Sequence, residues 1–117
     1  MLKDKLIGVI GAGAMGSALC RGLVDSNTIS PNRILVGDTH KTRAVELQDS
    51  VGVKIASTNS QIAKFTDIVI LAIKPFMVTT VLDEAKDAFT RENGKPLPLI
   101  ISIAAGIRIK TLEMQLL

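Results

Sequence analysis

The chain has 117 residues, and 47% of them are hydrophobic, which is enough to form the packed core of one domain spanning residues 1–117. The formal net charge of +3 is spread along the chain without a basic block, and Trp and Tyr are absent, so nucleic acid is not an expected partner. With one cysteine, no N-terminal signal sequence and no apolar run as long as a membrane span, the sequence favours a cytoplasmic protein with no internal disulfide and no membrane contact.

The first predicted element is an apolar strand at residues 6–10, which leads directly into the loop Gly11-Ala12-Gly13-Ala14-Met15-Gly16. In such a G-x-G-x-x-G loop the first glycine allows a tight turn and the second lets the backbone approach a pyrophosphate, while the third lets the following helix pack on the strand. The unpaired N–H groups at the start of that helix attract the anion. The loop therefore predicts a dinucleotide-binding site. The alternative is a fold of the same kind that keeps its glycines only for packing.

The second predicted strand, at residues 34–36, is followed closely by Asp38. This acid lies 22 residues after the last glycine of the loop, near the position at which an acidic side chain bonds the ribose hydroxyls of a dinucleotide. An Asp after a strand is also a common helix N-cap. Its carboxylate would repel the 2′-phosphate of NADP, whereas Lys41 and Arg43 would attract it, so the choice between NAD and NADP stays open. The single histidine, His40, has two interpretations: a contact with the adenine end of the cofactor, or a solvated residue at the helix start, which is the one we expect.

The middle of the chain alternates helices and strands. We predict a polar helix at residues 39–50, a short strand at 53–55, a helix with Asn59 as its N-cap and an uninterrupted apolar strand at 68–73. Phe65 is expected to face the core from the helix that Asn59 opens. Lys74-Pro75 ends the long strand, because proline has no N–H for the ladder but suits the first turn of a helix.

A fifth predicted strand, at residues 99–104, follows a helix whose buried face carries Val78, Val81, Leu82 and Ala85. Five strands joined by helices predict an α/β fold with a Rossmann-type doubly wound parallel sheet in the order 3-2-1-4-5. A ligand of such a sheet lies across the carboxyl ends of strands one and four, where the strand order reverses.

Lys74 and the segment Ala104-Ala105-Gly106 have two interpretations each. Lys74 reaches a phosphate or ribose of the cofactor, or is simply exposed. Ala104, Ala105 and Gly106 admit a nicotinamide ring because they are small, or they form a turn. Cys20 lies in an apolar helix and is expected to be inert packing. The sequence contains no recognisable nucleophile, metal site or acid–base pair, so no catalytic residue and no metal ligand is predicted.

Three segments carry a family resemblance: Gly11-Ala12-Gly13-Ala14-Met15-Gly16, Ala72-Ile73-Lys74-Pro75 and Ile101-Ser102-Ile103-Ala104-Ala105-Gly106-Ile107. In order and spacing they resemble the amino-terminal domain of pyrroline-5-carboxylate reductase. The resemblance implies NAD(P)H-dependent reduction of 1-pyrroline-5-carboxylate to L-proline in proline biosynthesis, with NADP(H) or NAD(H) as cofactor. It also implies these cofactor-binding residues: Ile10, Gly11, Ala12, Gly13, Ala14, Met15, Gly16, Asp38, Asn59, Ala72, Ile73, Lys74, Pro75, Ile103, Ala104 and Ala105.

The resemblance also implies parts that this sequence does not show. In the family a Met-Pro-Asn motif and a helical carboxyl-terminal domain follow, and that domain makes the dimer and supplies the substrate pocket. The chain stops at Leu117 before these parts, so we expect it to be the cofactor-binding portion, inactive by itself, of an enzyme that forms a homo-oligomer. The alternatives are the cofactor domain of a hydroxyisobutyrate-dehydrogenase-like or coenzyme F420-dependent oxidoreductase, and a truncated or non-enzymatic nucleotide-binding module.

Overall fold

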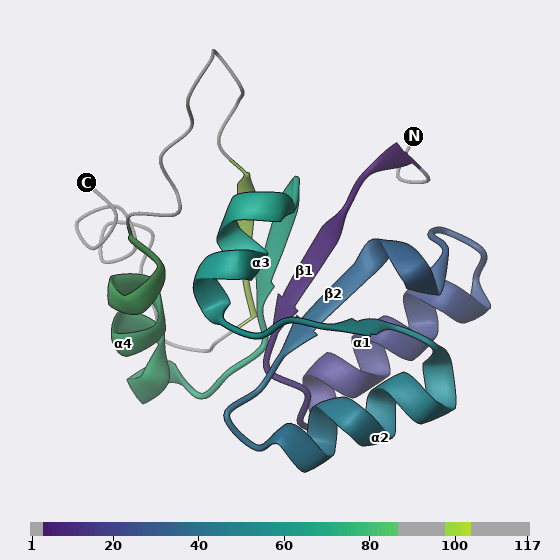
Figure 1. The fold of residues 1–117 in the computed structure, drawn as a ribbon, viewed down its shortest axis with the longest axis horizontal. Coiled ribbons are helices and arrows are strands. Elements are labelled where there is room, and N and C mark those ends of the chain that lie inside the picture. The colour runs from purple at the N-terminus through teal and green to yellow at the C-terminus, as the bar shows by residue number, and fades with distance from the viewer. Residues whose placement is uncertain (1–3, 87–97, 104–117) are drawn as a thin grey trace.

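The computed structural model describes residues 4–86 and 98–103, which form a parallel sheet flanked by helices (Figure 1). The elements in chain order are β1 (Ile7–Ile10), α1 (Ala14–Asp25), a 3-10 turn η2 (Pro31–Arg33), β2 (Ile34–Gly37), α2 (Lys41–Val51), β3 (Lys54–Ile55), α3 (Asn59–Phe65), β4 (Ile68–Leu71), α4 (Pro75–Ala85) and β5 (Leu99–Ser102). The strand order is β3-β2-β1-β4-β5, so the predicted doubly wound sheet is confirmed.

The strands pair so that their carboxyl ends finish at one edge of the sheet. Ile10 at the end of β1 lies opposite Gly37 of β2 and Leu71 of β4. β4 ends two residues earlier than predicted, although the Ala72 N–H still donates to the Ile10 carbonyl at 2.9 Å. The segments that follow β1, β2 and β4 therefore emerge side by side.

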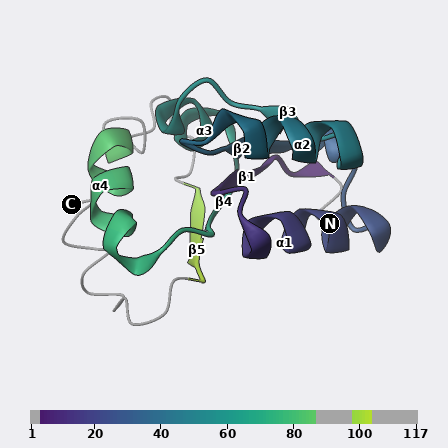
Figure 2. The ribbon, with the colours of Figure 1, turned by 90° about the horizontal axis from the view of Figure 1, so that it is seen from below.

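Two apolar clusters, one on each face of the sheet, form the core. Cys20 of α1 and Leu47 of α2 pack with Val9 on one face, while Ile62 of α3 and Leu82 of α4 belong to the cluster on the other. In Figure 2, β4 and β5 lie between α4 on one side and α1 on the other. Helices on both faces explain why the central strands are apolar throughout.

Side-chain exposure overturns one expectation about α3. Phe65 was expected to face the core, but it is 57% exposed, and the Lys64 ammonium lies 5.6 Å from its ring centre. Phe65 is the last residue of this short helix, and the buried positions are those of Ile62 and Ala63, three and two residues earlier. Among residues 4–86 and 98–103, no helix combines the length and apolar character that crossing a membrane requires.

Candidate functional site

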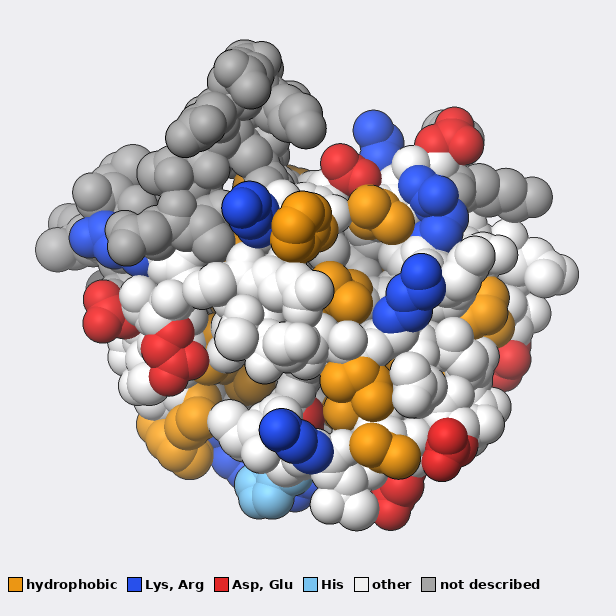
Figure 3. Space-filling model, in the orientation of Figure 1, with side chains coloured by type: hydrophobic (Ala, Val, Ile, Leu, Met, Phe, Trp, Pro, Cys, Tyr) orange, Lys and Arg blue, Asp and Glu red, His pale blue; other side chains and the backbone are white. Residues whose placement is uncertain are grey.

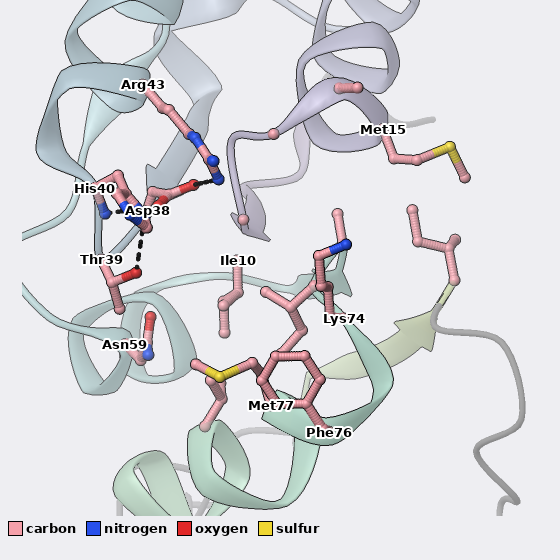
Figure 4. Close-up of a pocket in the computed structure, with 18 residues that line it drawn as sticks. Ile10, Met15, Asp38, Thr39, His40, Arg43, Asn59, Lys74, Phe76 and Met77 are labelled. Atoms are coloured by element: carbon pink, nitrogen blue, oxygen red, sulfur yellow. Dashed lines mark hydrogen bonds and ion pairs between the residues drawn. The ribbon is translucent and has the colours of Figure 1, made fainter.

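A cleft of about 630 Å³ opens where the carboxyl ends of β1, β2 and β4 meet (Figure 4). The strand order reverses at β1, because the chain adds β2 and β3 on one side of it and β4 and β5 on the other. Doubly wound sheets bind their ligands at this position. Eleven of the predicted site residues line it: Ile10, Gly11, Gly13, Ala14, Met15, Asp38, Asn59, Ala72, Ile73, Lys74 and Ile103. Ala12, Gly16 and Pro75 do not line it, and Ala104 and Ala105 lie outside the described residues.

The three glycines of the loop are required for different reasons. Gly11 has a φ of +108°, and a Cβ there would overlap the Ala72 carbonyl; a Cβ at Gly16 would overlap the Gly11 carbonyl oxygen. Gly13 has an ordinary φ of −72°, and the nearest atom to an added Cβ is an Arg43 guanidinium nitrogen 3.8 Å away. The fold thus needs Gly11 and Gly16, while the space beside Gly13 is open to the cleft. Packing alone therefore does not account for Gly13.

The start of α1 gives the same part of the cleft a positive potential. α1 begins at Ala14, directly after Gly13, and no side chain caps its N-terminus. The first N–H groups of a helix have no partner within it and carry the positive end of the helix dipole. Because Gly13, Ala14 and Met15 all line the cleft, this end of the helix can bind an anion.

Asp38 lies beside the glycine loop, and its carboxylate is held by main-chain N–H groups. One oxygen, Oδ2, accepts a hydrogen bond of 2.7 Å from Ala12, and the other, Oδ1, accepts one of 2.7 Å from His40. The N-cap of α2 is His40, so the interpretation of Asp38 as the helix N-cap is wrong. A contact between Asp38 and a ribose stays a prediction.

Basic side chains surround this acid from the solvent side. Arg43 Nη1 lies 4.0 Å from Asp38 Oδ2, and His40 Nδ1 lies 3.6 Å from Oδ1. The His40 side chain is 69% exposed, as expected of a solvated residue, yet it also lines the cleft. In Figure 3 the histidine lies at the lower edge of the molecule with blue basic side chains beside it.

Asn59 lines the cleft but does not cap α3. The N-cap is Thr58, whose side chain accepts a hydrogen bond of 3.1 Å from the Gln61 N–H. The extended backbone that an N-cap needs occurs at Thr58, with a φ of −145°, so Asn59 becomes the first helical residue. Its amide Nδ2 donates to Glu84 of α4 at 3.4 Å.

The other end of the cleft is mostly apolar. Lys74 is its basic side chain, and the sequence analysis missed three of its neighbours, Phe76, Met77 and Val81. Phe76 is 73% exposed and lies with Met77 beside Lys74 (Figure 4). For Phe76 and Met77 the available signal was their position in the first turn of α4, because the turn that follows a strand's carboxyl end borders the ligand edge of the sheet.

Thr39 and Gly37 also line the cleft and were not singled out from the sequence. Both flank Asp38, so the general rule that ligands bind at the ends of β-strands was the only signal for them. Among the described residues there is no cluster of three metal-ligating side chains.

Comparison with known proteins gives a consistent family context. Residues 6–106 match the family model described as NADP oxidoreductase, coenzyme F420-dependent. The chain is 37% identical over 116 residues, 99% of its length, to the pyrroline-5-carboxylate reductase of Methanosarcina acetivorans, of which it covers 41%. The curated relatives that it matches are therefore more than twice as long as this chain.

Solved structures show the same similarity. A pyrroline-5-carboxylate reductase from Coxiella burnetii matches with a TM-score of 0.85 and 31% identity, over 96% of this chain and 40% of that one. The pyrroline carboxylate reductase of Plasmodium falciparum, solved with NADP bound, matches with a TM-score of 0.80 and 27% identity, over 97% of this chain and 38% of that one.

Proposed function

Since the chain belongs to the family described as NADP oxidoreductase, coenzyme F420-dependent, and resembles pyrroline-5-carboxylate reductases, we propose that its cleft binds NADP(H) or NAD(H). We further propose that residues 1–117 are the cofactor-binding domain of an enzyme that reduces 1-pyrroline-5-carboxylate to L-proline. A helical domain that supplies the substrate pocket and the dimer contact belongs to the same proposal.

The observation that carries the proposal is the open space beside Gly13. Apart from its chain neighbours, a Cβ added at this position would meet no described atom closer than 3.8 Å, and α1 begins beside the same space, with Ala14 and Met15 in the cleft lining. A pyrophosphate fits these features, because it needs both a close backbone approach and donors that are not already paired.

The two ends of the cleft suit the two halves of a dinucleotide. The adenosine half would lie toward Asp38, Arg43 and Asn59, whose side chains are polar. The nicotinamide half would lie toward Lys74 and Ile103, where the lining is mostly apolar. When bound, the nicotinamide supplies the hydride that reduces the C=N bond of the imine. The chain's own part is to bind and orient the cofactor and to keep water from its reactive end.

Calorimetric titration of the chain with NADPH and with NADH tests the cofactor site. We expect binding that is lost in Gly13→Asp, because the new side chain occupies the open space and its charge repels a pyrophosphate. Gly22→Asp is the matched control, because a Cβ added at Gly22 has no described neighbour within 4 Å beyond the adjacent part of its own helix, and Gly22 does not line the cleft. Unchanged affinity in a folded Gly13→Asp variant would defeat the site assignment.

A further inference from the structure

Asp38 is the buried acid at the centre of the candidate site. Its side chain is 6% exposed, although it ends at a cleft that is open to solvent. Both carboxylate oxygens accept main-chain hydrogen bonds of 2.7 Å, one from Ala12 in the glycine loop and one from His40. Hydrogen bonds to an ionised carboxylate are about twice as strong as those between neutral groups. The acid thus has strong partners within the protein before any ligand arrives.

The bond to Ala12 ties the glycine loop to the end of β2. Ala12 is 4% exposed and does not line the cleft, so its N–H is directed to Asp38 rather than to the ligand space. A second bond runs beside it, from the Gly11 N–H to the Gly37 carbonyl at 2.7 Å. The two bonds join Gly11 and Ala12 of the loop to Gly37, the last residue of β2, and to Asp38, which follows it. They fix the loop immediately before Gly13.

We propose that Asp38 is a positioning residue that holds the glycine loop in the shape that receives the pyrophosphate, rather than an acid whose main role is to bind the ribose hydroxyls. The proposal rests on the proposed cofactor site. Loss of the carboxylate then lowers the affinity for any ligand that the loop binds through a phosphate, including a ligand without an adenosine half. A ribose-binding acid would affect only ligands that contain the adenosine ribose.

Asp38→Asn separates the two roles, because it keeps the shape of the side chain. Each carboxylate oxygen of Asp38 accepts a hydrogen bond from a main-chain N–H. The amide of Asn has only one oxygen, so its NH₂ group faces one of these two N–H donors and that hydrogen bond is lost. The two ligands to compare are NADH and reduced nicotinamide mononucleotide, which has the nicotinamide, one ribose and one phosphate. Binding of each is followed by the fluorescence of the reduced nicotinamide.

We expect Asp38→Asn to lower the affinities for NADH and for the mononucleotide by the same factor, about tenfold for the loss of one charge-assisted hydrogen bond. Loss of a negative charge near a phosphate would by itself strengthen binding, so the expected direction is opposite to a simple charge effect. Asp49→Asn, an exposed carboxylate of α2 that does not line the cleft, is the matched control and leaves both affinities unchanged. Weaker NADH binding with unchanged mononucleotide binding would overturn the proposal.

A second measurement needs neither a variant nor a ligand. In hydrogen exchange of the wild-type chain followed by NMR, we expect the Ala12 amide to be protected, because its N–H donates to the Asp38 carboxylate at 2.7 Å. An Ala12 amide that exchanges as fast as an unbonded loop amide would overturn the proposal. If the wild-type chain binds neither NADH nor NADPH, the proposed function fails, while this exchange measurement still tests the hydrogen bond on which the positioning role depends.

Discussion

The three glycines of the loop are required for different reasons, two of them within the protein and one outside it. Gly11 is fixed by its φ of +108° and by the Ala72 carbonyl, and Gly16 by the Gly11 carbonyl that α1 approaches. Each of these two glycines lets two backbone segments touch, so any side chain there opens the fold. At Gly13 neither the backbone conformation nor a neighbouring atom of the protein requires a glycine. A glycine without a structural reason in the protein is best explained by a ligand that comes equally close.

Cys20 allows a prediction about stability at high pH. Its side chain is 0% exposed, and burial raises the pKa of its thiol from 9.0 to about 11, with the Arg21 charge acting weakly in the opposite direction. Because the folded-state pKa is the higher one, the thiol's contribution is fully present below pH 9 and is lost as the pH rises through 11.

Chemical denaturation of wild type and Cys20→Ala between pH 8 and 11.5 would measure this contribution. We expect the free energy of unfolding of the wild type to fall by on the order of 2 kcal/mol more than that of the variant over this range. The comparison with the variant removes the effect of lysines that titrate in the same range. Parallel pH profiles would contradict the prediction.

Arg43 allows a prediction about cofactor choice. Its guanidinium is half exposed, 4.0 Å from the Asp38 carboxylate and 3.8 Å from the Cβ position at Gly13, so it borders the space proposed for the phosphates. We expect Arg43→Gln to lower the affinity for NADPH more than that for NADH, changing their ratio by about tenfold for each ~1.4 kcal/mol lost. Lys41→Gln is the control, because Lys41 is exposed but does not line the cleft. An equal effect of both variants, measured by calorimetry, would argue for nonspecific charge attraction.

At the scale of elements, the beginnings of helices were predicted less well than the helices themselves. Pro75 starts α4 as predicted, because its fixed φ and missing N–H are properties of the residue alone. The start of α3 was placed one residue late, at Asn59 instead of Thr58. Ser57, Thr58 and Asn59 all suit a turn or a cap, so composition alone does not choose among them.

The cap of α3 gives a prediction at this scale. Thr58→Ala removes the acceptor for the Gln61 N–H, and we expect it to lower the free energy of unfolding by about 1 kcal/mol. Thr58→Ser keeps the hydroxyl and should keep most of the stability. Urea unfolding of both variants measures the difference. Equal losses in Ala and Ser would mean that the methyl group, not the cap, is responsible.

At the scale of the whole molecule, the cleft exists because β1 is flanked by β2 on one side and β4 on the other. The segments that leave these strands diverge to opposite faces, toward α1 and α2 on one and α4 on the other, and leave an open space between them. No single element forms this site. Its two chemically different ends come from different strands: polar residues after β2, and mostly apolar residues after β4.

This division leads to a prediction about turnover. In the described part of the chain, the side chains that line the end of the cleft proposed for the nicotinamide are apolar apart from Lys74, so they offer little to hold a carboxylated imine in place. Holding donor and acceptor at reacting distance supplies several kcal/mol of barrier lowering. We therefore expect the 117-residue chain to bind NADPH but to form proline far more slowly than a full-length relative.

The test is an assay of proline formation from 1-pyrroline-5-carboxylate and NADPH, with the M. acetivorans reductase as the reference. Calorimetry on the same sample shows that the cofactor site is intact. Robust proline formation by the chain alone would place a substrate pocket within these residues or between copies of the chain.

The sequence by itself determined the parts of this protein that depend on local pattern. Apolar strands separated by helices predicted a parallel sheet. Because the crossover connections between parallel strands are right-handed, few strand orders are possible. The order 3-2-1-4-5 and the edge that carries the cleft were therefore both predictable. The glycine loop was recognisable from local pattern as well. Its three glycines, within six consecutive residues, have the spacing needed for a tight turn, a close approach of the backbone to a pyrophosphate and close packing of the helix on the strand.

Only the tertiary structure decided which partner each site residue has. Asp38 bonds to Ala12, 26 residues away in sequence, so no local pattern indicated this contact with the glycine loop. The open space beside Gly13 and the polar contact from Asn59 to Glu84 likewise depend on how distant segments pack. Residue type and spacing fix backbone geometry over a few residues, whereas hydrogen-bond partners and free volume are set by distances between segments that the chain brings together only on folding.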